Sequence, residues 1–163
     1  LPTQVINLLS GFVFKPLLSQ YGAAVGERDF IRFRQLYRRH LFLIGGLTVF
    51  CCLAGYLLGT QVLGLFYAVD LSAYRLELFL TILSGGFIAA GSMSYYLLVM
   101  LRKQMWIFLN YALNIGIGVV ISVLLVKNFS ILGGVLSILV SQALLFFVFA
   151  IFLLFFTRRT SDA

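Results

Sequence analysis

The chain has 163 residues, enough for one soluble domain, but 62% of them are hydrophobic and only 10% are charged. Because a soluble domain carries roughly a quarter of its residues as Asp, Glu, Lys or Arg, this composition and a mean hydropathy of +1.07 exclude a water-exposed globule. The net charge of +7 does not indicate a nucleic-acid binder, since the basic residues form short clusters between long apolar runs. We therefore expect an all-α, polytopic membrane helix bundle.

Five stretches of the chain are long and apolar enough to cross a membrane as helices. A spanning helix needs roughly 20 residues, at about 1.5 Å of rise each. The predicted spans cover residues 3–25, 41–67, 76–101, 105–126 and 132–157. The connections between them are too short to form further domains. Residues 1–163 are thus expected to form a single transmembrane bundle.

The first predicted span carries a cation near its middle, Lys15, followed directly by Pro16. An ammonium group at that depth costs roughly 2.5–3.5 kcal/mol on insertion scales, so it requires a partner, a carbonyl or a watery cavity. Lys15 either lines a polar pathway for an anionic substrate or caps a carbonyl that Pro16 leaves without its hydrogen bond. Pro16 is expected to kink the helix. Asn7 is predicted to extend the same polar face.

A basic link, residues 26–40, separates the first two spans and is expected to form an interfacial amphipathic helix. Its basic residues are Arg28, Arg32, Arg34, Arg38 and Arg39. Two further pairs, Arg102-Lys103 and Arg158-Arg159, fall on the same side of the predicted membrane. The excess of positive charge assigns that side to the cytoplasm of a plasma membrane, with the C-terminus there. The first span then enters from outside, so we expect a preceding span upstream.

Small residues recur at helical spacing in three of the spans, which is typical of close helix packing in lipid. They are Gly55 and Gly59, then Gly85, Ala89 and Ser92, and finally Gly133, Ser137 and Ser141.

Asn110 and Asn114 share one face of the fourth span. They either clamp two helices, at about 0.6 kcal/mol per hydrogen bond, or line a pathway. No catalytic constellation is recognisable, because the one histidine, His40, stands alone and no carboxylate pair lies within a span. Adjacent Cys51 and Cys52 suit small buried hydrophobes rather than a metal site. We expect neither an enzyme nor a bound cofactor or metal.

Several short strings occur in a characteristic order: residues 14–18 (FKPLL), 26–30 (GERDF), 63–67 (LGLFY), 83–87 (LSGGF), 102–104 (RKQ) and 132–137 (LGGVLS). In order and spacing the chain resembles the polysaccharide-biosynthesis flippases, the O-antigen and capsule exporters of the multidrug/oligosaccharidyl-lipid/polysaccharide superfamily. The resemblance covers nearly the whole chain. It implies two bundles of six helices, of which this chain supplies helices two to six of the C-terminal bundle, beside a missing N-terminal bundle.

The resemblance also implies a function. The substrate would be a polyprenyl-pyrophosphate-linked oligosaccharide, moved from the inner to the outer leaflet by alternating access and coupled to H⁺ or Na⁺. Lys15, assisted by Asn7, Asn110 and Asn114, would line its pathway. The expected partners are this lipid-linked sugar, the surrounding membrane lipids and the N-terminal bundle. Two alternatives remain: a drug or cation antiporter of the same superfamily, and a non-transporting membrane scaffold for polysaccharide assembly.

Overall fold

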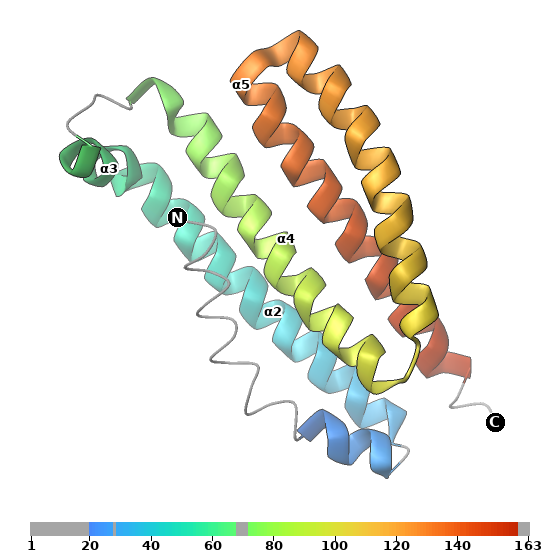
Figure 1. Cartoon of the computed structure of the whole chain (residues 1–163). Helices are drawn as coiled ribbons and strands as arrows, with labels where there is room; N and C mark the ends of the chain where they lie inside the picture. The colour runs from blue at the N-terminus through green and yellow to red at the C-terminus, as the bar shows by residue number, and fades with distance from the viewer. Residues whose placement is uncertain (1–19, 28, 68–71, 160–163) are drawn as a thin grey trace.

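The computed structural model describes residues 20–27, 29–67 and 72–159, and nearly all of these residues are helical (Figure 1). The prediction of an all-α membrane-type bundle is confirmed. Three of the described helices are long and apolar enough to cross a membrane. In chain order the elements are a helical segment at residues 20–26, α2 (Phe30–Ala54), a π-helix (Gly55–Gly59), α3 (Thr60–Tyr67), a 3-10 turn (Ser72–Tyr74), α4 (Arg75–Met100) and α5 (Gln104–Arg159).

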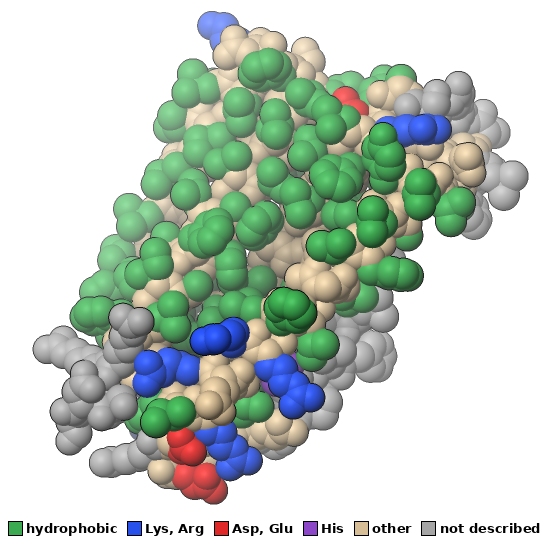
Figure 2. Space-filling view, turned by 180° about the vertical axis from the view of Figure 1, so that it is seen from behind, with side chains coloured by type: hydrophobic (Ala, Val, Ile, Leu, Met, Phe, Trp, Pro, Cys, Tyr) green, Lys and Arg blue, Asp and Glu red, His purple; other side chains and the backbone are tan. Residues whose placement is uncertain are grey.

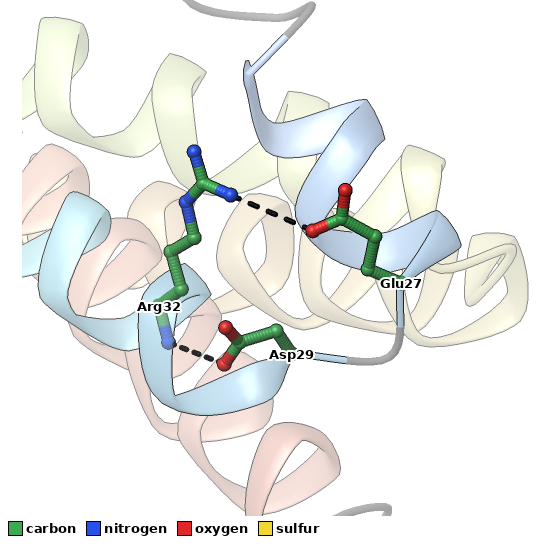
Figure 3. A network of polar contacts seen from close by, with 3 residues as sticks. All are labelled: Glu27, Asp29 and Arg32. Carbon is green, nitrogen blue, oxygen red and sulfur yellow. Dashed lines mark hydrogen bonds and ion pairs between the residues drawn. The ribbon is translucent and has the colours of Figure 1, made fainter.

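Helix α2 begins with a side-chain cap. The Asp29 carboxylate accepts a hydrogen bond from the backbone N–H of Arg32 at 2.9 Å, and satisfies a donor that the first turn would otherwise leave open. The Arg32 guanidinium also forms an ion pair with Glu27 at 3.5 Å, which links the residues before the turn to the first turn after it (Figure 3). The cap therefore fixes the start of α2 well before the apolar run that begins at Leu41.

The prediction of a separate interfacial helix in the basic link, residues 26–40, is wrong. From Phe30 onward this segment is the first part of α2 and continues without a break into the second predicted span. Phe33, Tyr37, His40 and Ile44 are buried and follow one another at steps of four, three and four, so they form one continuous helix face. Neither glycine nor proline interrupts the residues between Phe30 and Ile44. The helix therefore propagates through the arginines.

The far end of α2 changes to a π-helix, where two glycines approach α4. A Cβ atom at Gly55 would collide with the Ile82 side chain, and one at Gly59 would lie 2.6 Å from Cδ2 of Leu78. Both positions thus allow the backbone to come close to α4, as the predicted GxxxG packing requires.

Helix α4 is the central helix and packs against both α2 and α5, whereas α2 and α5 have few contacts with each other (Figure 1). Its bounds agree closely with the predicted span at residues 76–101. Gly85, Gly86 and Ala89 are buried. A Cβ atom at Gly86 would overlap the side chain of Thr48 on α2. Small residues on α4 therefore set its distance from α2.

Helix α5 contains 56 residues, which would extend about 84 Å if straight, far beyond a bilayer core of about 30 Å. It is divided at Ser130, whose φ of 50° and ψ of −120° are not helical. The chain folds back there into a first arm, residues 104–129, and a second arm, residues 131–159 (Figure 1). These arms match the predicted spans 105–126 and 132–157, but the predicted connection at 127–131 shrinks to little more than Ser130. Most of the predicted span 3–25 lies outside the described residues, so the total of five spans stays a prediction.

Candidate functional site

Four of the predicted functional residues lie outside the described residues: Asn7 and Lys15 of the substrate pathway, Pro16 at the helix kink and Arg28 of the basic link. Their proposed roles stay predictions, and the candidate site is built here from the residues that the structure describes.

The two predicted pathway asparagines join the arms of α5. The Asn110 side-chain amide donates a hydrogen bond to the Leu145 carbonyl at 3.3 Å, and the Asn114 amide donates to the Ser141 carbonyl at 2.9 Å. Asn110 is only 3% exposed. Near Asn114, a Cβ atom at Gly118 would lie 3.1 Å from the Ser141 hydroxyl, so the arms are closely apposed. In this arrangement both asparagines act as clamps between the arms.

Two polar pairs that sequence reasoning missed lie at the end of the bundle where α2 begins. The Tyr21 hydroxyl and Nδ1 of His40 are 2.7 Å apart, and the Tyr37 hydroxyl lies 2.8 Å from the Ser94 hydroxyl of α4. Because Ser94 donates its own proton to the Ala90 carbonyl, Tyr37 is the donor in the second pair. All four side chains of these pairs are buried. The sequence signal that could have indicated these pairs was the helical spacing of Tyr37 and His40 with the apolar residues of the same face of α2.

The arginines of α2 surround these buried pairs with positive charge. Arg32 is engaged with Glu27, and Nε of Arg34 donates to the Phe30 carbonyl at 3.3 Å. Arg38 and Arg39 are exposed, and neither has an ion pair within the described part of the chain.

The turn between α4 and α5 adds further positive charge at the same end. It contains Arg102, with a φ of 55°, and Lys103, whose Nζ lies 4.8 Å from the centre of the Phe156 ring. In Figure 1 the start of α2, this turn and the end of α5 lie together at one end of the bundle. Lys and Arg side chains gather at that end, while hydrophobic side chains cover most of the face between the ends (Figure 2). We call this region the basic end, defined by Arg32, Arg34, Arg38, Arg39, Arg102 and Lys103.

A groove of about 280 Å³ opens between α2 and α5, with α4 as its floor. It exists because α2 and α5 both pack on α4 without closing over it. The lining residues are almost all apolar: Leu41, Ile44, Gly45, Thr48, Val49, Leu83, Gly86, Phe87, Ala90 and Phe146. Thr48 is the one hydroxyl-bearing residue among them, and its hydroxyl already donates to the Ile44 carbonyl at 2.7 Å. The groove therefore presents an apolar surface, suited to hydrocarbon rather than to sugar hydroxyls.

Within the described ranges, no group of three or more His, Cys, Asp or Glu side chains is placed to hold a metal ion. Cys52 is buried and Cys51 is half-buried, and both are free thiols in the last turn of α2.

Comparison with known proteins does not place the chain in a family. No protein-family model, no curated protein and no solved structure matches it. The resemblance to the polysaccharide flippases therefore depends on the sequence strings alone.

Proposed function

We propose that the chain forms part of a membrane transporter that moves a polyprenyl-pyrophosphate-linked oligosaccharide from the inner to the outer leaflet by alternating access. The observation that carries the proposal is the combination of an apolar groove with a basic end on the same bundle. A lipid-linked pyrophosphate combines a long hydrocarbon chain with a compact anionic group. Such a substrate needs an apolar surface for one part and positive charge for the other.

The way the helices pack also supports a transporter. The arms of α5 are joined by hydrogen bonds, so α5 is expected to move as one unit. The contact of α4 with α2 and the π-helix instead uses small residues such as Gly86 and Gly55, which would let the helices slide. Alternating access requires such a combination of a stable unit and a movable neighbour. Lys15 would compensate the negative charge of the pyrophosphate within the membrane.

In this proposal the basic end faces the cytoplasm, because cytoplasmic loops of membrane proteins carry the excess of Lys and Arg. The protein would then be a multi-pass plasma-membrane protein with its C-terminus in the cytoplasm. The remaining wall of the substrate cavity would come from an N-terminal bundle, and the coupling ion would be H⁺ or Na⁺.

A second candidate is a non-transporting scaffold for polysaccharide assembly. It is favoured by one observation: the side-chain amides of Asn110 and Asn114 donate hydrogen bonds to carbonyls within α5 instead of facing a pathway. This scaffold would recruit its partners through the arginines of the basic end.

The test is transport by the intact protein in proteoliposomes, measured as inner-to-outer leaflet movement of a labelled polyprenyl-pyrophosphate sugar. The informative variant is Lys15→Met, and the matched control is Lys127→Met, which removes an exposed charge near the Ser130 turn. We expect Lys15→Met to lower the rate by roughly tenfold or more at equal insertion, equivalent to at least about 1.4 kcal/mol of lost charge compensation. The Lys127→Met protein should transport at the unmodified rate.

Equal transport by both variants would keep the flippase and assign Lys15 to helix structure. Absence of transport in the unmodified protein, under an imposed H⁺ or Na⁺ gradient, would favour the scaffold. Ion-coupled efflux of a lipophilic cation without sugar movement would instead indicate the drug antiporter.

A further inference from the structure

The apolar groove is open on one side, and its flanks are exposed hydrophobic side chains. Val49 on one wall is 59% exposed, and Phe147, beside the lining residue Phe146, is 54% exposed. In a bilayer such a surface faces hydrocarbon, and an empty groove would forfeit the dispersion contacts of its walls. A flexible chain that enters the groove restores those contacts. At about 280 Å³, the groove lies just below the roughly 300–1,000 Å³ typical of ligand pockets, so it suits part of a single chain.

The groove wall continues directly into positive charge along α2. Arg34, Arg38, Leu41, Gly45 and Thr48 follow one another at steps of four, three, four and three, which places them on one helix face. Leu41, Gly45 and Thr48 line the groove. Arg38 lies about one helical turn beyond Leu41, towards the basic end. The helix face that would contact an acyl chain thus leads to the Arg38 guanidinium, at the depth where the acyl chain would join its headgroup.

Arg38 is available for an anion. It is exposed and forms no ion pair with any described residue, and the Glu27 carboxylate is paired with Arg32. Arg39 is also exposed, but it lies about 100° further round α2, on the side of Phe42 and Gly46, which do not line the groove. The helix therefore provides two arginines in adjacent positions, of which only Arg38 continues the groove.

We propose that this groove is a binding site for an anionic membrane phospholipid, with one acyl chain between α2 and α5 and the phosphate on Arg38, assisted by Arg34. The proposal does not depend on transport, since the phospholipid would occupy the groove whenever no lipid-linked substrate fills it. Charge complementarity carries it: anionic headgroups gather at clustered arginines, with about 1 kcal/mol of attraction for each basic residue near the surface. The hydrocarbon lining then selects a lipid over a free phosphate.

The experiment uses the full-length protein in phosphatidylcholine vesicles that contain a trace of phosphatidylglycerol with a diazirine on one acyl chain. After irradiation, mass spectrometry measures the cross-link yield and the labelled peptides. We expect labels on the α4 segment around Leu83 and Phe87 and on the α5 segment around Phe146. The zwitterionic phosphatidylcholine probe with the same diazirine should label these segments less.

Two matched pairs of variants test the two halves of the site. A Cβ atom at Gly45 or at Gly46 meets nothing within 4 Å, so a side chain can begin at both positions without a clash, but only Gly45 lines the groove. Gly45→Leu should abolish labelling of the groove segments, and Gly46→Leu should leave it unchanged. Arg38→Gln should lower the yield about fivefold, as expected for loss of one basic contact, while Arg39→Gln should not. If a leucine variant misfolds, as judged by gel filtration, Gly45→Ala and Gly46→Ala give the same comparison with a smaller effect.

Several results would overturn the site. Equal labelling of Gly45→Leu and Gly46→Leu would show that the chain binds elsewhere. Equal effects of Arg38→Gln and Arg39→Gln, or equal labelling by the two headgroups, would show that Arg38 does not bind the phosphate. Absence of lipid labels from a protein that elutes as a dimer in gel filtration would identify a second copy as the occupant. Displacement of the probe by polyprenyl phosphate, but not by unlabelled phosphatidylglycerol, would assign the groove to the transported lipid instead.

Discussion

The two sides of α4 are built differently. On one side the arms of α5 pack on α4 and are joined to each other by the amides of Asn110 and Asn114. On the other side α2 and the π-helix after it meet α4 through Gly55, Gly59 and Gly86, and leave the apolar groove beside the contact. Between the described residues of α2 and α4, Tyr37 and Ser94 form the one side-chain hydrogen bond.

From this difference we predict a fixed part and a movable part of the bundle. In lipid, polar bonds hold helices in one register, whereas small apolar faces hold them close without fixing their position. We expect α5 to behave as a stable hairpin, and α2 to shift along α4 about its polar contact near the basic end. Substitutions at the two contacts should therefore have different consequences.

The largest effect is expected at the turn of α5. Gly133→Ala places a methyl group against the backbone carbonyl of Leu125, and a backbone atom cannot move aside as a side chain can. We expect a loss at or above the upper end of the about 1–3 kcal/mol typical of overpacking, measured as the free energy of unfolding in mixed detergent micelles. Gly134→Ala is the control, because a Cβ atom there meets nothing within 4 Å. Equal stability of the two variants would mean that the arms are not closely apposed at the turn.

A smaller loss is expected at the contact between α2 and α4. Gly86→Ala overlaps Thr48, whose side chain is held in place by its hydrogen bond to Ile44. Because α2 can shift to relieve the overlap, we expect about 1–2 kcal/mol, below the effect of Gly133→Ala. The control Gly45→Ala, which meets no neighbour, should be neutral or slightly stabilising through its higher helix propensity. A loss as large as that of Gly133→Ala would show that α2 is as firmly fixed as α5.

Features that depend on one stretch of the chain were predictable from the sequence, whereas features that depend on how separate helices pack were not. The span at residues 76–101 and the two arms of α5 were predictable, because long apolar runs specify helices in a membrane. The start of α2 was not, since hydropathy separates charged from apolar residues but does not show that one helix can contain both. A connection was predicted at residues 127–131, but neither glycine nor proline marks Ser130 as the residue where the chain reverses. The groove depends on α2 and α5 both packing on α4, which spacing within one helix cannot reveal.

The clamps of α5 are expected to contribute modestly. Replacing Asn110 and Asn114 together by leucine removes both bonds between the arms, at about 0.6 kcal/mol each, for a total of about 1.2 kcal/mol of unfolding free energy. The control is Asn128→Leu, because the exposed Asn128 amide donates only within its own helix, to the Leu124 carbonyl. If transport is lost while this stability loss stays small, the asparagines would also serve the pathway; unchanged transport would restrict them to the hairpin.

The smallest effect on stability, and the most specific one on motion, is expected at Tyr37. Tyr37→Phe removes the hydroxyl that donates to Ser94, but Ser94 keeps its own bond to the Ala90 carbonyl, so no donor is left open. The loss should therefore be about 0.6 kcal/mol. Tyr56→Phe, at an exposed position in the π-helix that follows α2, should cost nothing measurable.

If the Tyr37 bond limits the movement of α2, its removal should change exchange between helix positions more than it changes stability. A spin-label pair on α2 and α4 would measure this as a broader distance distribution in Tyr37→Phe than in Tyr56→Phe. Identical distributions would show that the small-residue contact alone fixes α2. The contacts of α2 and of α5 would then differ in the type of bond, but the two helices would not differ in mobility.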